Sequence, residues 1–133
     1  MLAISDTPVG IDVERLKKER LAVAERFFCK EEYEDILKVE GLERESRFLE
    51  YWTMKEAYVK RTGNGLYTPL NSFLINRVGG GLSTVAQEDI YFGTFFLEEQ
   101  RYCVSVCSEY KDEMKELSKY AMREIKLNQI MEE

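Results

Sequence analysis

The stretch 51-YWTMKEAYVKRTGNGL-66 predicts a helix that carries a carboxylate on its apolar side. At about 100° per residue, Glu56 lies about 40° around the helix from Trp52, inside the apolar arc. Lys55 and Lys60 lie at the two margins of this arc. The opposite side of the helix carries polar side chains: Arg47, Glu50, Thr53 and Arg61.

Two interpretations of Glu56 are open at this point. The first is an ordinary exposed ion pair with Lys60, worth about 0.2–0.5 kcal/mol. The second is a metal and phosphate site, because an ionised carboxylate at an apolar interface is costly unless a cation pairs with it. The two lysines could extend their stems over apolar surface and offer their ammonium groups to an anion.

A second acidic pattern stands near the N-terminus, in the stretch 10-GIDVE-14. Strand alternation places Asp12 and Glu14 on one face with Gly10, roughly 7 Å apart, while the valines and Ile11 take the other face. Unpaired carboxylates at this spacing repel, and a divalent cation between them removes the conflict. The alternative is a solvated polar strand face, which this fragment alone favours.

The hydrophobic pattern along the chain predicts an α+β domain. The expected elements, in chain order, are strands at 1–5 and 8–14, helices at 17–28, 29–39 and 43–62, strands at 73–78, 90–98 and 101–109, and a helix at 110–133. Gly63 is the expected C-cap of the long helix, and turns are expected at 79–81 and 98–100. One side of the last helix is apolar and carries Tyr110, Met114, Leu117, Ala121 and Ile125.

Composition and charge exclude several function classes. The net charge of -6 argues against non-specific binding to nucleic acid or to an anionic membrane, and no apolar run approaches the roughly 20 residues that span a bilayer. The N-terminus lacks the features of a signal peptide. The chain has no histidine, which removes histidine-assisted nucleophiles and histidine-bound metals.

The three cysteines indicate where the protein works. Cys29, Cys103 and Cys107 fit no zinc-binding spacing, and any disulfide scheme leaves one of them unpaired. Cys103 and Cys107 share one face of a predicted strand, so we expect buried free thiols. Free thiols favour a reducing cytoplasm.

These residues together resemble the C-terminal half of an Sfp-type 4'-phosphopantetheinyl transferase. That family carries a Gly-Ile/Val-Asp-x-Glu strand and, farther along, a helix of the form Trp/Phe-Ser/Thr/Cys-x-Lys-Glu-Ala/Ser-x-x-Lys. Here the two motifs stand as GIDVE at 10–14 and WTMKEAYVK at 52–60. Between them, AERFFCKEEYEDI at 24–36 resembles the family's Arg-Phe-Phe-x-x-Glu-Glu segment. The resemblance covers about residues 3–108.

The resemblance implies Mg²⁺-dependent transfer of 4'-phosphopantetheine from coenzyme A to a serine hydroxyl of an acyl or peptidyl carrier protein, with release of 3',5'-ADP. Asp12, Glu14 and Glu56 would hold Mg²⁺, and Lys55 and Lys60 would contact the phosphates of coenzyme A. Glu56 or a water molecule on the metal would deprotonate the serine, which makes Glu56 and Lys60 the catalytic candidates. No nucleic acid or membrane partner is implied.

The implied fold is one half of such a transferase: a small antiparallel sheet packed against a long helix and shorter helices. Residues 1–133 would form one domain, with a family-like core over 1–108 and the closing helix over 109–133. The segment from Leu16 to Phe28 would form part of the carrier-protein surface. Its apolar side chains suit the docking of a helix: Leu21, Val23 and Phe27.

The sequence departs from the two-half family in one respect. The N-terminal half of an Sfp-type enzyme supplies basic residues and a His-Ser-Gly-like element to coenzyme A, whereas this chain has no histidine. Three expectations follow: a fragment of a longer protein, a half-length protein that works as a homo-oligomer, or a non-catalytic binding and assembly module. A different metal-dependent phosphate-transferring enzyme is a further alternative.

Overall fold

The computed structural model describes residues 8–16, 21–63, 68–79, 81–99 and 101–119. Its elements, in chain order, are β1 (Gly10–Arg15), α1 (Leu21–Phe27), α2 (Lys30–Leu37), α3 (Gly41–Thr62), the 3-10 turn η2 (Leu70–Ser72), β2 (Ile75–Asn76), β3 (Ser83–Val85), β4 (Tyr91–Leu97), β5 (Tyr102–Ser108) and α4 (Lys111–Ser118). The order confirms the predicted α+β class. None of the helices formed by the described residues is long and apolar enough to cross a membrane.

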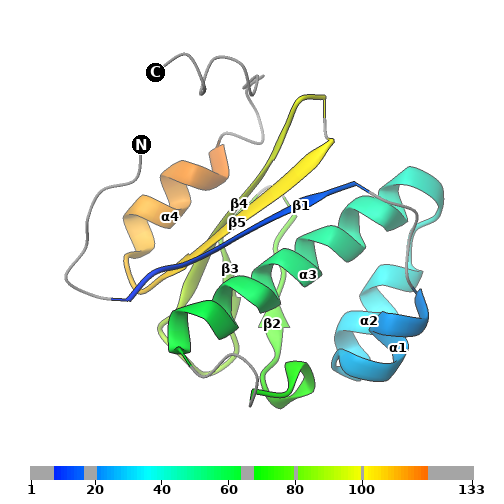
Figure 1. Cartoon of the computed structure of the whole chain (residues 1–133), viewed down its shortest axis with the longest axis horizontal. Coiled ribbons are helices and arrows are strands. Elements are labelled where there is room, and N and C mark those ends of the chain that lie inside the picture. The colour runs from blue at the N-terminus through cyan, green and yellow to red at the C-terminus, as the bar shows by residue number, and fades with distance from the viewer. Residues whose placement is uncertain (1–7, 17–20, 64–67, 80, 100, 120–133) are drawn as a thin grey trace.

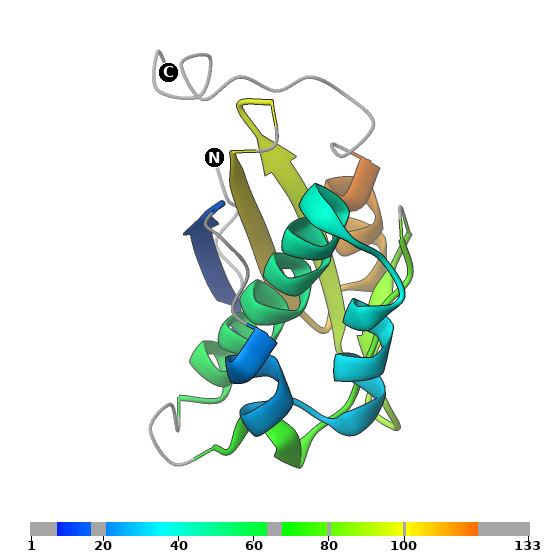
Figure 2. The ribbon, with the colours of Figure 1, turned by 90° about the vertical axis from the view of Figure 1, so that its right-hand side faces the viewer.

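The described strands form one antiparallel sheet in the order β1-β5-β4-β3-β2. β1 therefore lies at one margin of the sheet and β2 at the other, as Figure 2 shows. The register of β1 against β5 places Asp12 opposite Ser105 and Glu14 opposite Cys103. The acidic strand β1 is thus held in place by β5, the last strand in the chain, which is far away in sequence.

The long helix α3 lies along one face of the sheet, with α4 on the opposite face and α1 and α2 beyond α3 (Figure 1). Toward α1 and α2, α3 presents Phe48 and Trp52, whose rings stack 6.1 Å apart. Phe28 completes this aromatic cluster, with its ring centroid 5.7 Å from that of Phe48. Toward the sheet, α3 presents Thr53 and Ala57, both fully buried.

The polar side of α3 therefore lies partly in the core, which the sequence pattern did not indicate. Thr53 has no exposed surface, donates a hydrogen bond to the Leu49 carbonyl (2.8 Å), and lies 2.7 Å from the hydroxyl of Ser105 on β5. A threonine hydroxyl is tolerated in a core when its hydrogen bonds are satisfied inside the protein. A helix with packed layers on two sides has no single apolar stripe.

The predicted helix ends and strands agree with the structure at several positions. Gly63 caps α3 in the left-handed conformation, with φ of 75°, as expected. The strands predicted at 90–98 and 101–109 are β4 and β5, and the turn between them contains Glu98 and Glu99 at positive φ. Cys103 and Cys107 are buried free thiols, as predicted.

Other predictions were incomplete or fall outside the described residues. The strand expected at 73–78 is limited to the two residues of β2, and β3 was not predicted, because three residues are too few to establish an alternating pattern. The last helix is confirmed over Lys111–Ser118. The strand expected at 1–5 and the continuation of the last helix beyond residue 119 lie outside the described residues.

Gly10 is where β1 passes closest to α3. A Cβ atom built at Gly10 would collide with the carbonyl oxygen of Ala57 and would lie 2.7 Å from the amide nitrogen of Arg61. These are backbone atoms of a packed helix and cannot rotate away, so a side chain here forces β1 and α3 apart. We expect Gly10→Ala to lower the free energy of unfolding by about 1–3 kcal/mol or more in urea denaturation. Unchanged stability would contradict this packing.

Candidate active site

β1 and α3 together carry the three carboxylates that the sequence singles out. Asp12 on β1 points under α3 and is only 4% exposed, while Glu14 on the same face and Glu56 on α3 are half-buried. The charge of Glu14 acts on both Asp12 and Glu56. The three acidic side chains therefore share one electrostatic environment at the junction of the sheet margin and the helix.

Lys60, one turn beyond Glu56 on α3, pairs with the buried aspartate. Its Nζ donates a 2.6 Å hydrogen bond to Oδ1 of Asp12, and its side chain is 53% exposed. The pair that Lys60 makes is thus with β1, instead of the exposed contact with Glu56 that helical spacing allows. The other carboxylate oxygen, Asp12 Oδ2, is buried, and with the Asp12 and Glu14 carboxyl groups both ionised no side chain or backbone N–H of the described residues donates a hydrogen bond to it.

Burial raises the pKa of both acidic groups next to Lys60. Burial raises the pKa of Asp12 to about 6. The hydrogen bond from Lys60 opposes this rise, whereas repulsion from Glu14 and a hydrogen bond shared with the Glu14 carboxyl group add to it. Burial also raises the pKa of Glu56, against the attraction of Lys60. The hydrogen bond to Asp12 raises the pKa of Lys60. Negative charge at this site is therefore incompletely compensated by the protein.

We expect Asp12 to destabilise the metal-free fold at neutral pH. Its pKa rises from 3.8 to about 6 on folding, so the stability it contributes is fully present below about pH 4 and is lost as pH rises through 6. Asp12→Asn should therefore raise the free energy of unfolding at pH 7.5 by about 1–3 kcal/mol, with little difference at pH 4. Urea denaturation in EDTA at both pH values measures this. A less stable Asp12→Asn protein at pH 7.5 would contradict the raised pKa.

The residues of this site fit a hard divalent cation in their chemistry. In the part of the chain that the structure describes, no three Cys, Asp or Glu side chains are arranged to hold a metal ion directly. Asp12 Oδ2, however, is a buried oxygen to which none of the described residues donates a hydrogen bond, and such groups are rare because they are costly. Carboxylate oxygens are the ligands that Mg²⁺ prefers. The ligand set of Asp12, Glu14 and Glu56 stays a prediction.

Lys55, the phosphate contact suggested by the resemblance, is buried and paired within the protein. Its side chain has no exposed surface, and Nζ donates to the carbonyls of Leu70 (2.5 Å) and Phe73 (2.7 Å) and to Glu32 Oε1 (2.8 Å). These partners use all three donors of the ammonium group. Burial lowers the pKa of Lys55, and the pairing with Glu32 opposes that shift. The phosphate contact of Lys55 stays a prediction.

Glu32 is the residue that analysis of the sequence alone missed. Its carboxylate is fully buried, and besides Lys55 it accepts hydrogen bonds from the backbone N–H groups of Cys29 (2.9 Å) and Ile75 (2.8 Å). The Lys55–Glu32 pair thus ties α2, α3 and the segment 70–75 together. The sequence does show two adjacent glutamates in the first turn of α2. Acidic residues are favoured there by the helix dipole, so the pattern gave no reason to expect a buried partner.

The apolar side chains proposed for carrier docking are not equally available. Phe27 at the end of α1 is 47% exposed, with the Arg26 guanidinium 5.3 Å from its ring centroid. Leu21 and Val23 pack against the core and are only partly exposed. The lysines that precede them, Lys17 and Lys18, lie outside the described residues. Phe27 is therefore the apolar group that this segment offers most openly.

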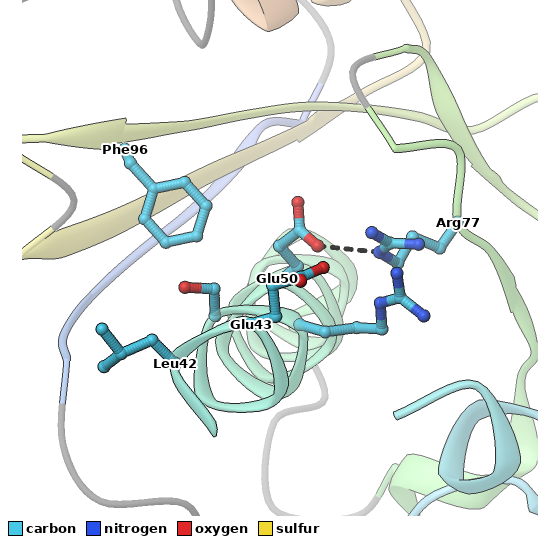
Figure 3. Close-up of a pocket in the computed structure, with 7 residues that line it drawn as sticks. Leu42, Glu43, Glu50, Arg77 and Phe96 are labelled. Carbon is cyan, nitrogen blue, oxygen red and sulfur yellow. Dashed lines mark hydrogen bonds and ion pairs between the residues drawn. The ribbon is translucent and has the colours of Figure 1, made fainter. Parts of the chain in front are cut away.

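A separate cavity of about 290 Å³ lies at the opposite end of α3 (Figure 3). Leu42 and Glu50 of α3, Phe96 of β4 and Arg77 line it. The Arg77 guanidinium donates a 2.7 Å hydrogen bond to Glu50 and lies 3.5 Å from Asp35. Arg77 and Glu50, which face this cavity, are paired with each other, and none of the cavity's lining residues belongs to the acidic site around Asp12.

Comparisons with known proteins place these features in a family. The profile of the 4'-phosphopantetheinyl transferase superfamily matches residues 8–111. The 4'-phosphopantetheinyl transferase Sfp of Bacillus subtilis is 32% identical over 127 residues, which cover 92% of this chain and 56% of Sfp. The 4'-phosphopantetheinyl transferase psf-1 of Bacillus pumilus is 42% identical over 87 residues, 65% of this chain and 37% of psf-1.

A solved structure supports the fold. The holo-[acyl-carrier-protein] synthase of Thermotoga maritima superposes with a TM-score of 0.56 at 23% identity, covering 76% of this chain and 61% of that one. The chain spans about half the length of the curated relatives it matches. With the acidic strand and the Trp-x-x-Lys-Glu helix both inside the matched residues, the chain belongs to the 4'-phosphopantetheinyl transferase superfamily.

Proposed function

We propose that this chain supplies the acidic metal site of a 4'-phosphopantetheinyl transferase. The reaction would be Mg²⁺-dependent transfer of 4'-phosphopantetheine from coenzyme A to a serine hydroxyl of an acyl or peptidyl carrier protein, releasing 3',5'-ADP. The observation that carries the proposal is Asp12, a buried carboxylate with one oxygen that receives no hydrogen bond from the described residues, beside Glu14, Glu56 and a lysine. The names of its relatives support the same reaction.

Each residue would have a distinct task in this reaction. Mg²⁺ held by Asp12, Glu14 and Glu56 would neutralise the negative charge of the coenzyme A diphosphate. Lys60, whose ammonium is half-exposed, would bind phosphate oxygens. A contact of Lys55 with phosphate would require its ammonium to leave Glu32.

The chemical step is a substitution at the phosphorus that carries pantetheine. The serine oxygen forms a bond to this phosphorus, and the bond from phosphorus to the oxygen bridging the two phosphates breaks, leaving 3',5'-ADP. Glu56 would accept the serine proton. Burial raises the pKa of Glu56, which brings the group closer to the range that suits a general base near neutral pH.

The proposal includes a second half for the site. Because the chain spans about half of its relatives, the remaining contacts to coenzyme A would come from an N-terminal half or from a second copy of this chain. Phe27 and its neighbours on α1 would contact the carrier protein. The three free cysteines favour a reducing compartment, so we place the reaction in the cytoplasm.

Mass spectrometry of a carrier protein tests this function. The full chain is incubated with coenzyme A, Mg²⁺ and an apo carrier protein, and the carrier is weighed. We expect a phosphopantetheine adduct that disappears when EDTA is added. If the folded chain binds a divalent cation yet forms no adduct, the alternative of a non-catalytic binding and assembly module is favoured.

A further inference from the structure

The ammonium group of Lys60 lies beside Asp12, where it would compete with a metal ion for this carboxylate. The ammonium of Lys60 lies 2.6 Å from Oδ1 of Asp12, and the aspartate has no other hydrogen-bonded side-chain cation among those the structure describes. Asp12 is nearly fully buried, and among the carboxylates of this site it is the one to which Lys60 donates a hydrogen bond. A lysine and a divalent cation at this carboxylate repel each other.

The Lys60 side chain is able to leave this position. It is 53% exposed and stands near the C-terminal end of α3, two residues before the helix ends at Thr62. A lysine is a point charge on a flexible four-carbon stem, so moving its ammonium costs little apart from the lost ion pair. An anionic phosphate near the metal would replace Asp12 as the partner of Lys60.

We propose that Lys60 is a place-holder cation that makes metal binding conditional on a diphosphate ligand. Without the ligand, Lys60 neutralises Asp12 and competes with the metal ion. With a diphosphate bound, Lys60 pairs with phosphate oxygens and leaves both Asp12 oxygens to the metal. The metal and the diphosphate then bind cooperatively, and by linkage each strengthens the other equally. This inference rests on the proposed metal site.

Titration with Mn²⁺, followed by the electron paramagnetic resonance of the free ion, tests the coupling. The full chain is titrated with and without coenzyme A as the diphosphate probe, and a protein-free titration corrects for Mn²⁺ bound by coenzyme A itself. For the wild type we expect coenzyme A to increase Mn²⁺ affinity about tenfold. For Lys60→Met we expect Mn²⁺ alone to bind about tenfold tighter than to the wild type, with less than about a twofold gain from coenzyme A.

Two further variants separate the charge from its side chain. Lys60→Arg keeps a cation at Asp12 and should keep the wild-type pattern. Lys119→Met is the matched control, because Lys119 is similarly exposed (52%) but directly follows α4, the helix that lies on the opposite face of the sheet from α3. Lys119→Met should bind Mn²⁺ like the wild type in both titrations.

The outcomes distinguish this inference from the proposed function. If Lys60→Met binds Mn²⁺ alone no tighter than the wild type does, the place-holder role is overturned while the metal site stands. If Lys60→Met binds tighter but coenzyme A changes nothing in the wild type, competition is supported and the coupling to diphosphate is overturned. If neither protein binds Mn²⁺ under any condition, the metal site fails and this inference fails with it.

Discussion

Replacing Lys55 by methionine is expected to lower the free energy of unfolding by about 3–5 kcal/mol, the cost of leaving one member of a buried ion pair without its partner. Methionine has a similar length but no charge, so Glu32 would remain buried without its cation, and the carbonyls of Leu70 and Phe73 would lose a donor. A loss of this size is a large part of the 5–15 kcal/mol that stabilises a typical domain. Urea denaturation followed by circular dichroism measures it.

Two controls assign the effect to the buried pair. Lys30→Met removes a lysine of α2 that is 83% exposed, and it should change stability by less than about 0.5 kcal/mol. The double variant Glu32→Gln with Lys55→Met removes both charges but keeps a side-chain oxygen for the N–H groups of Cys29 and Ile75. It should recover part of the lost stability, because no buried charge is left without its partner. If Lys55→Met is as stable as the wild type but binds coenzyme A more weakly, Lys55 is the phosphate contact that the sequence suggested.

Glu56→Gln is expected to slow phosphopantetheine transfer by roughly 10²–10⁴-fold, as for the loss of a general base, and to weaken metal binding as well. Glutamine keeps the shape of the side chain but cannot accept the serine proton or offer a negative charge to Mg²⁺. Because burial raises the pKa of Glu56, removal of its charge should leave the fold at least as stable as the wild type. The rate of adduct formation on the carrier protein measures transfer, and urea denaturation measures stability.

Glu43→Gln is the matched control on the same helix. Glu43 is exposed near the beginning of α3, far along the helix from Glu56, so this change should leave the transfer rate within about twofold of the wild type. Transfer by Glu56→Gln at the wild-type rate would remove Glu56 from both the base and the ligand role. A parallel loss in Glu43→Gln would point to the net charge of α3 instead of to one carboxylate.

Local patterns in the sequence predicted the parts of the site that depend on one element. Strand alternation in GIDVE was enough to place Asp12 and Glu14 on one face of β1, and the register against β5 confirms this. The left-handed Gly63 that ends α3 is likewise a local signal. The resemblance of the two motifs then indicated the family, which the comparisons confirm.

The partners of the two lysines in the structure could not be predicted in this way, because these partners lie far away in sequence. Lys55 is buried and pairs with Glu32 and with the backbone carbonyls of Leu70 and Phe73. Its position on the helix alone gives no sign of these partners. Lys60 pairs with Asp12, 48 positions earlier, instead of with its helical neighbour Glu56. The burial of Thr53 was likewise not predictable from the sequence, since a helix packed on two sides can bury polar residues whose hydrogen bonds are satisfied.

The central claim is that Asp12 holds a divalent cation for phosphopantetheine transfer. The most direct measurement is the number of Mn²⁺ ions bound per chain at saturation in the presence of coenzyme A, by electron paramagnetic resonance, for the wild type and for Asp12→Asn. We predict one ion per wild-type chain and none per Asp12→Asn chain, although the variant should be the more stable fold at neutral pH. Equal binding of Mn²⁺ by the two proteins would contradict the account.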